Sequence, residues 1–177
     1  MSLIVGGLAV VEFRKITWDN FEECIGLELH QEQKNYVASN VYSLAQSYIA
    51  LLNDDLPAMT FTIYDEETMI GFIMLYHDTT EENEYGDEPC YGILRLMIDR
   101  RFQGKGYGKK AMIKALEFIM TFPQGEASAV YISYDPSNKV AKHLYSSFGF
   151  EETGKVNDVG EVIVRRELNF SFPTKKG

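Results

Sequence analysis

The segment that most constrains the fold is residues 101–110, RFQGKGYGKK, in which three glycines stand at alternate positions. An apolar run at 93–98 precedes it and has the composition of a buried strand, whereas residues 111–122 repeat apolar side chains at helical spacing. Glycines let a backbone adopt positive φ and approach a ligand closely. Because the first N–H groups of a helix have no internal partner, this strand, glycine turn and helix predict a site for a phosphate group.

The spacing of these glycines separates the segment from two common phosphate-binding motifs. It fits neither the dinucleotide fingerprint, Gly-x-Gly-x-x-Gly, nor the P-loop, Gly-x-x-x-x-Gly-Lys-Ser/Thr. It resembles the pyrophosphate-binding motif of the GNAT superfamily of N-acetyltransferases, Arg/Gln-x-x-Gly-x-Gly/Ala, which here occupies residues 101–106. Residues 138–150 resemble the second signature of that superfamily, Asn-x-x-Ala-x-x-Leu-Tyr-x-x-x-Gly-Phe. Two separated signatures in the expected order support the resemblance together.

The resemblance implies that the protein transfers an acetyl group from acetyl-CoA to a primary amine, by direct attack in a ternary complex. In this superfamily a bulge splays the strand before the turn, so the backbone of Met97 and Ile98 would pair with the pantetheine arm of CoA. Asn138 would contact the same arm, and Tyr145 would protonate the departing thiolate. The remaining implied cofactor contacts are Arg101, Phe102, Gln103, Gly104, Lys105, Gly106, Tyr107, Gly108, Lys109 and Lys142.

Asn138 and Tyr145 are seven residues apart, so they share one face of a helix, roughly 10 Å apart along its axis. A phenol held in place can act as a general acid. Each residue also has a purely structural interpretation. Tyr145 could pack in the core with Ala141 and Phe148, and Asn138 could cap the start of the helix.

Removal of the amine's proton needs a base, and some members of the superfamily supply a glutamate from the strand before the glycine turn. The corresponding residues here, 91–96, are YGILRL and contain no acid. Glu28 and Glu84 are therefore the candidate catalytic bases, with Glu32 as a further candidate, acting directly or through water. The alternative for each is a solvated surface carboxylate.

Two acidic regions bear on the identity of the amine. Residues 27–37 and the loop at 78–88 resemble the bacterial spermine/spermidine acetyltransferases of the same superfamily. Carboxylates lining a groove attract a polycation and bind it through charge-assisted hydrogen bonds, which favours a polyamine or a diamine. The predicted substrate-binding residues are Glu28, Glu32, Glu82 and Glu84. The alternatives are another amine, such as an aminoglycoside or a protein N-terminus, and a non-catalytic acyl-CoA sensor.

Length and charge restrict the class of protein. With 177 residues the chain is expected to form a single domain, 1–177, with a core at about 10–170. The net charge of −9 argues against nucleic-acid binding, which needs a basic surface. Two cysteines and three histidines without metal-ligand spacing predict neither a disulfide framework nor a metal site. The apolar start at 3–11 is too short to span a membrane, so we expect a cytoplasmic protein, with a homodimer as an expectation from the family.

Periodicity and turn residues predict a mixed α/β fold, with a mostly antiparallel sheet of about six or seven strands flanked by about four helices. The resemblance adds a splayed central pair of strands. The predicted strands are 10–16, 59–64, 69–76, 93–98, 129–134, 150–156 and 161–168, and the predicted helices are 21–29, 39–52, 111–122 and 135–148. The second helix carries an apolar stripe, and Asp135 with Pro136 is predicted to start the last helix.

Overall fold

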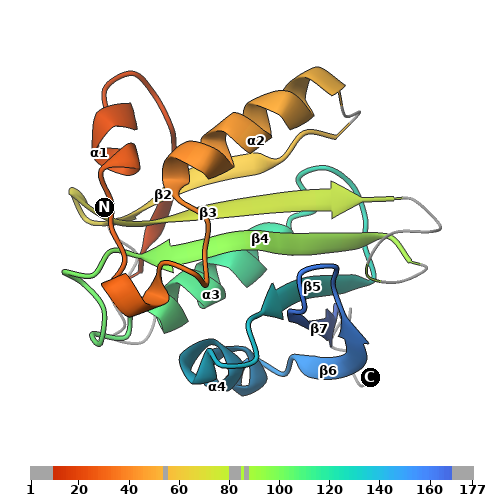
Figure 1. Ribbon diagram of the computed structural model, residues 1–177. Coiled ribbons are helices and arrows are strands. Elements are labelled where there is room, and N and C mark those ends of the chain that lie inside the picture. The colour runs from red at the N-terminus through yellow and green to blue at the C-terminus, as the bar shows by residue number, and fades with distance from the viewer. Residues whose placement is uncertain (1–9, 54–55, 80–84, 86–87, 169–177) are drawn as a thin grey trace, which may run out of the picture.

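The computed structural model describes residues 10–53, 56–79, 85 and 88–168. Within them, one sheet of seven strands is flanked by four α-helices and one 3-10 turn (Figure 1). The strands are β1 (Glu12–Lys15), β2 (Met59–Asp65), β3 (Thr68–Asp78), β4 (Cys90–Ile98), β5 (Ala129–Tyr134), β6 (Glu151–Val156) and β7 (Val162–Glu167). The helices are α1 (Phe21–Ile25), α2 (Asn40–Asn53), α3 (Tyr107–Ile119) and α4 (Lys139–Ser147), and the 3-10 turn is η1 (Gln31–Gln33).

The strands follow the order β1-β2-β3-β4-β5-β7-β6 across the sheet. Every neighbouring pair of these described strands is antiparallel except β4 and β5, which run parallel. A parallel pair needs a crossover connection, and α3 supplies it. The predicted mixed α/β fold with a mostly antiparallel sheet is therefore confirmed.

The central strand β4 loses a neighbour partway along its length. Its first four residues pair with β5, and the last of these pairs is Ile93 with Ile132. On its other side, Met74 of β3 pairs with Arg95 and the next β3 residue pairs with Ile93, so Leu94 is an extra, bulged residue. The bulge coincides with the point where β4 and β5 separate. Beyond it no described strand pairs with the β5-facing edge of β4, which confirms the splayed central pair.

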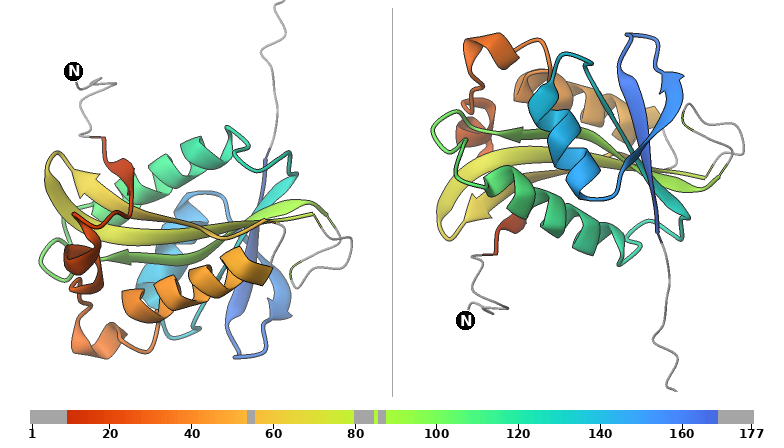
Figure 2. Two further views of the ribbon diagram at one scale, coloured as in Figure 1. Left: turned by 90° about the horizontal axis from the view of Figure 1, so that it is seen from above. Right: turned by 90° about the horizontal axis from the view of Figure 1, so that it is seen from below.

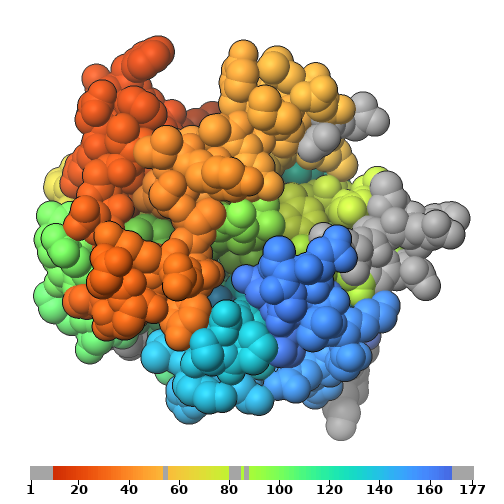
Figure 3. Space-filling view, in the orientation of Figure 1, coloured from red at the N-terminus to blue at the C-terminus, as the bar shows by residue number. Residues whose placement is uncertain are grey.

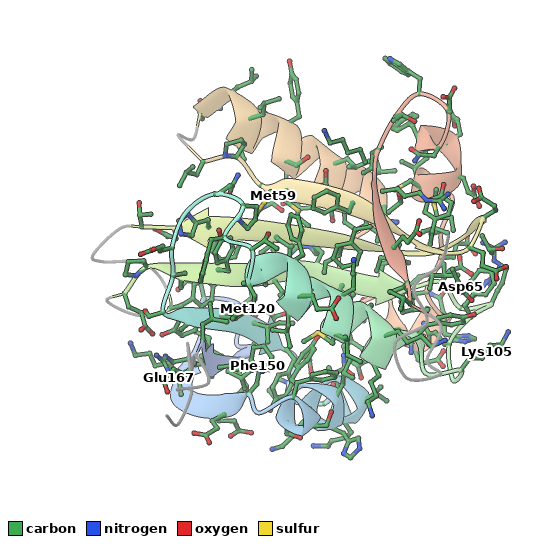
Figure 4. The ribbon with its side chains drawn as sticks, turned by 180° about the vertical axis from the view of Figure 1, so that it is seen from behind. Met59, Asp65, Lys105, Met120, Phe150 and Glu167 are labelled. Atoms are coloured by element: carbon green, nitrogen blue, oxygen red, sulfur yellow. The ribbon has the colours of Figure 1, made fainter. Side chains whose placement is uncertain are left out.

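The two larger apolar cores lie on opposite faces of the sheet. Figure 2 shows α3 over one face and α2 over the other. The larger core packs α3, through fully buried residues such as Met112 and Ile119, against β2 to β5, and it includes Tyr145 of α4. Figure 4 shows α3 lying across this face. The smaller core, around Cys24, packs α1 and α2 against the other face. Because both faces are covered, β3 from Met69 to Tyr76 is continuously apolar, and β4 is apolar except for Arg95.

Only part of the apolar stripe predicted on the second helix is buried, since Leu44 packs against the smaller core and other members face solvent. Val41 and Tyr48, two members of the stripe, are 56% and 60% exposed. The buried residues of α2 are Asn40 and Ser43. The Asn40 amide donates a hydrogen bond to the carbonyl oxygen of Cys24 (2.8 Å). Periodicity thus located the helix correctly, but the buried face is centred on Asn40, Ser43 and Leu44, beside the centre of the apolar stripe.

Two helix boundaries differ from the prediction for local reasons. The first helix ends at Ile25, where the N–H of Gly26 closes the last turn, so Leu29 lies outside it. The third helix begins at Tyr107, earlier than the predicted 111–122, because Gly106 in a left-handed conformation forms its N-cap. Glycine turn and helix are therefore contiguous.

The prediction that Asp135 starts the last helix is wrong. Asp135 accepts a hydrogen bond from the N–H of Ser137 (2.8 Å) and so forms a turn ahead of the helix. The cap is Asn138, whose Oδ1 accepts a hydrogen bond from the N–H of Ala141 (3.1 Å). The helix accordingly begins at Lys139.

Candidate active site

The separation of β4 from β5 opens a cavity of about 680 Å³. It is lined by the free edge of β4 at residues 93–98, by the glycine turn and by one face of α4. Two surface segments, 33–38 and 157–161, complete its wall. Figure 3 shows the hollow between the orange segment that contains 33–38 and the blue segment that contains 157–161. Segments far apart in the sequence thus meet around the unpaired strand edge.

The glycine turn leaves room for a ligand. Gly104 and Gly106 have φ values of 74° and 81°, which residues with a Cβ rarely adopt. A Cβ placed on either would meet no heavy atom within 4 Å, so both face open space. Gly106 is also the N-cap of α3 and has no side chain to accept a hydrogen bond from its first turn. The N–H groups that begin at Tyr107 are therefore placed for an external acceptor such as a phosphate.

Asp99 ties this turn to the N-terminal part of the chain. Its buried carboxylate accepts hydrogen bonds from the side chain (2.7 Å) and the N–H (3.0 Å) of Arg101, and from the N–H of Glu28 (2.9 Å). Burial alone would raise the pKa of Asp99, but these hydrogen bonds, led by that from the Arg101 side chain, outweigh it and lower the pKa below its ordinary value. The guanidinium of Arg101 is consequently bound to a protein carboxylate.

The structure brings nine of the predicted cofactor residues to the cavity and leaves five outside its lining. Those that line it are Met97, Ile98, Gln103, Gly104, Gly106, Tyr107, Gly108, Asn138 and Tyr145. Those that do not are Arg101, Phe102, Lys105, Lys109 and Lys142. Lys105 donates to the carbonyl oxygen of Arg101 (3.1 Å), and Lys142 pairs with Glu152 (2.8 Å). The backbone positions of the prediction thus come together, whereas its basic side chains face other protein groups or solvent.

Tyr145 is a wall of the cavity and a member of the core at once. It is only 8% exposed, and its ring lies beside those of Tyr134 and Phe150, with centroids 6.1 and 6.2 Å away. Burial raises the pKa of its hydroxyl far above the ordinary value, and the charge of Glu161 raises it further. The hydroxyl therefore keeps its proton at physiological pH. Asn138 also combines two positions, as helix cap and as cavity wall.

The acids predicted as bases or substrate ligands do not line the cavity where the structure describes them. Glu28 pairs with Arg100 (2.9 Å), and its side chain is half exposed. Glu32 is exposed on η1. Glu82 and Glu84 lie outside the described residues.

Two other carboxylates line the cavity, and the sequence analysis did not select either. Asp158 and Glu161 belong to the turn between β6 and β7. Glu161 was predicted only as the first residue of the strand 161–168, and Asp158 lies between the two last predicted strands. Because β7 pairs with β5, Tyr134 lies opposite Val162, and the turn comes next to the end of β5 where β4 departs. The signal was weak: an acid after a turn is common, and only the pairing of β5 with β7 brings it here.

The cysteine side chains lie outside the cavity lining. Cys24 and Cys90 are unpaired and buried, and burial raises the pKa of their thiols to about 11 and about 12. Among the described residues, no cluster of three His, Cys, Asp or Glu side chains could hold a metal ion. No helix in the described part of the chain has the length and apolar character needed to cross a membrane.

Comparison with known proteins bears on this site. The chain matches the family model described as acetyltransferase (GNAT) family over residues 11–150. It is 27% identical over 160 residues to the spermine/spermidine N(1)-acetyltransferase of Bacillus subtilis (strain 168), an alignment that covers 89% of this chain and 99% of that protein. It is 26% identical over 125 residues to the alpha/beta-tubulin-N-acetyltransferase 9 of Drosophila melanogaster, covering 65% of this chain and 61% of that protein.

Solved structures share the fold at lower identity. A spermidine N-acetyltransferase from Vibrio cholerae in complex with CoA and spermine has a TM-score of 0.64 and 19% identity, covering 89% of this chain and 94% of that chain. An aminoglycoside acetyltransferase in complex with coenzyme A has a TM-score of 0.67 and 18% identity, with the same two coverages. These proteins thus share the overall fold of this chain.

Proposed function

Because the chain belongs to the acetyltransferase (GNAT) family, we propose that this acetyl-CoA-dependent N-acetyltransferase acts on a polyamine or diamine, such as spermine or spermidine. The observation that carries the proposal is one cavity in which the free edge of β4, Tyr145 and the carboxylates Asp158 and Glu161 meet. The Bacillus relative named for spermine and spermidine supports the same class of acceptor.

The chain's backbone would bind the acetyl donor. Acetyl-CoA supplies the acetyl group as an activated thioester. The unpaired edge of β4 at Met97 and Ile98 offers backbone N–H and C=O groups to an extended ligand, as an edge strand does to an added strand. Gly104, Gly106 and the first turn of α3 offer N–H groups to a pyrophosphate. The open space over both glycines is the feature that a bulky side chain would remove.

Tyr145 would donate the proton to the departing thiolate. Its hydroxyl is protonated at neutral pH, as an ordinary phenol is, and burial raises its pKa further. A positioned acid of this kind contributes about 10²–10⁴ to the rate. Asn138 would assist indirectly, since it caps α4 and so sets where Tyr145 lies two turns later.

Charge favours an acceptor with several ammonium groups. The chain carries a net charge of −9, and Asp158 and Glu161 add local negative charge in the cavity wall. Lys34 and Arg95 also line the cavity, so its wall carries both signs of charge. The guanidinium of Arg95 is oriented by hydrogen bonds that it donates to the carbonyl oxygen of Leu94 (2.8 Å) and to a side chain of α2. A diamine gains from both carboxylates, whereas a monoamine can occupy only one at a time.

The test is release of free CoA thiol from acetyl-CoA with spermine, spermidine, putrescine, an aminoglycoside and a short peptide as acceptors. Putrescine is compared with n-butylamine, which has the same carbon chain and one ammonium group. We expect polyamines to be acetylated, and putrescine to show a KM about 10-fold or more below that of n-butylamine. If only the aminoglycoside or only the peptide is acetylated, that class of compound replaces polyamines as the proposed acceptor. Tight CoA binding without turnover of any amine would favour a sensor.

A further inference from the structure

Glu161 is held in one orientation by its neighbours. The N–H of Glu161 donates to Oδ1 of Asn157 (2.9 Å), and the N–H of Asn157 donates to the carbonyl oxygen of Glu161 (3.0 Å). The Asn157 amide also donates to Oε2 of Glu161 (2.9 Å), and the hydroxyl of Ser133 donates to the same oxygen (2.6 Å). A turn closed by three hydrogen bonds and a contact from β5 therefore fix this carboxylate.

The two oxygens of Glu161 differ in their surroundings. Oε2 accepts two hydrogen bonds, whereas Oε1 accepts none from the described residues. Glu161 is partly buried and lines the cavity together with Ser133 and Tyr145. A carboxylate that is oriented through one oxygen and open at the other can accept strong hydrogen bonds from a cation.

We propose that Oε1 of Glu161 binds the reacting ammonium group of the acceptor and takes its proton, which releases the neutral amine beside Tyr145. This proposal rests on the proposed function, because it assumes that the acceptor is an amine. It assigns the general base, which the strand before the glycine turn does not supply. In this step one N–H bond of the ammonium breaks, its electron pair stays on nitrogen, and the proton passes to Oε1 and then to water.

Other acids fit this role less well. Glu28 pairs with Arg100, and Glu152 pairs with Lys142, both outside the lining of the cavity. Asp158 lines the cavity but lies exposed in the turn. It is better suited to a second ammonium group at the rim than to the reacting one. Glu161 and Tyr145 line the same cavity, and the charge of Glu161 adds to the effect of burial in raising the pKa of Tyr145.

The variant Glu161→Gln tests the proposal with little change in shape. A glutamine carbonyl can accept both hydrogen bonds that Oε2 now accepts, while its NH₂ group replaces Oε1 with a donor that repels an ammonium. Binding of spermidine, putrescine and kanamycin to the CoA-loaded protein is measured by calorimetry, and turnover is measured with acetyl-CoA. We expect the tightest-bound amine to lose about 10- to 100-fold in affinity, and turnover to fall by about 10²-fold or more.

The matched control is Glu117→Gln, which changes the same charge on an exposed site of α3 away from the cavity. Ser133→Ala, which keeps the carboxylate but removes one of its two donors, should give a smaller loss than Glu161→Gln. The proposal would be overturned if Glu161→Gln had the same amine affinity and turnover as Glu117→Gln. It would also be overturned if the wild-type protein bound none of the three amines. If polyamines are not acetylated but acetylation of another amine still depends on Glu161, only the choice of polyamine as acceptor is wrong.

Discussion

The side-chain amides of Gln33 and Gln103 form a reciprocal pair, each donating to the other's carbonyl oxygen at 2.9 and 2.8 Å. Gln103 belongs to the glycine turn and donates a second hydrogen bond to the carbonyl oxygen of Ile98 (2.9 Å). Gln33 begins the segment 33–38 that lines the cavity. Segment 33–38 overlaps the region 27–37 that resembles the spermine/spermidine acetyltransferases, and we propose it as the acceptor side of the cavity. The pair would then connect the cofactor turn directly to the acceptor side.

Gln33→Met should weaken acceptor binding because it removes this connection while keeping the length of the side chain. Loss of the two hydrogen bonds of the pair, each worth about 0.5 kcal/mol or more, predicts an amine KM raised about 5-fold or more. Steady-state kinetics checks this, with Gln31→Met as the control, since Gln31 is exposed on η1 and makes no side-chain hydrogen bond within the described residues. Equal KM values for the two variants would show that the pair does not order the acceptor side.

Gly106→Val should reduce CoA affinity by about 10-fold or more, because its side chain would fill the open space over the turn. Strain from positive φ also lowers stability, by about 1–2 kcal/mol. Gly154→Val is the matched control: Gly154 has nearly the same φ (79°), also faces open space and does not line the cavity. Calorimetric titration with CoA should separate them. Intact CoA binding by Gly106→Val would place the pyrophosphate elsewhere.

Tyr145→Phe should lower turnover by about 10²-fold or more while CoA affinity stays within about twofold. The ring would keep its contacts with Tyr134 and Phe150, so the fold should survive. Tyr48→Phe, at an exposed position of α2, controls for loss of a hydroxyl. Turnover is measured at saturating acetyl-CoA. If it is unchanged, Tyr145 is only a packing residue.

Gly71→Ala should cost about 1–3 kcal/mol of unfolding free energy, because the new Cβ would lie 2.3 Å from the backbone oxygen of Met97 and force β3 from β4. Gly108→Ala is the contrast, since its Cβ would lie at an ordinary 3.6 Å from Leu144 and alanine favours the helix. Urea unfolding should rank the first variant below wild type and the second at or above it. If Gly71→Ala were as stable as the wild type, β3 and β4 would be able to move apart at Gly71 at little cost in free energy.

Acid should destabilise the protein partly through Glu88. Hydrogen bonds from Arg165 foremost, at 2.6 and 3.0 Å, lower the pKa of Glu88 from 4.5 to about 2, although burial opposes them. Because the folded-state pKa is depressed, this stabilisation is complete above about pH 4.5 and is lost as the pH falls towards about 2. Its size is at most about 3 kcal/mol.

Urea unfolding from about pH 6 to about pH 2.5 checks this, comparing wild type with Glu88→Gln. The variant should be less stable at the higher pH and should lose less stability on acidification. Glu167→Gln, at the exposed end of β7, serves as the control. Parallel stability curves for wild type and Glu88→Gln would show that the ion pair with Arg165 contributes nothing to acid sensitivity.

Local patterns in the sequence determined the scaffold of the site. The glycine turn, the apolar strand before it and the two signatures predicted the fold class, the family, acetyl-CoA and the cavity positions of Tyr145 and Gly106. These features are local because a turn conformation, a helix start and a strand composition depend on residues close together in the chain. The resemblance supplied the splayed strands, which no local pattern shows.

Only the tertiary structure decided which acids line the cavity and which face of α2 is buried. Glu161 lines the cavity because β7 pairs with β5. Glu28 forms an ion pair with Arg100 and lies outside the cavity lining. Likewise, α2 buries Asn40, which donates a hydrogen bond to Cys24 of α1, and leaves Val41 and Tyr48 of its apolar stripe exposed. Such outcomes depend on contacts between segments far apart in the chain, and periodicity within one segment does not encode them.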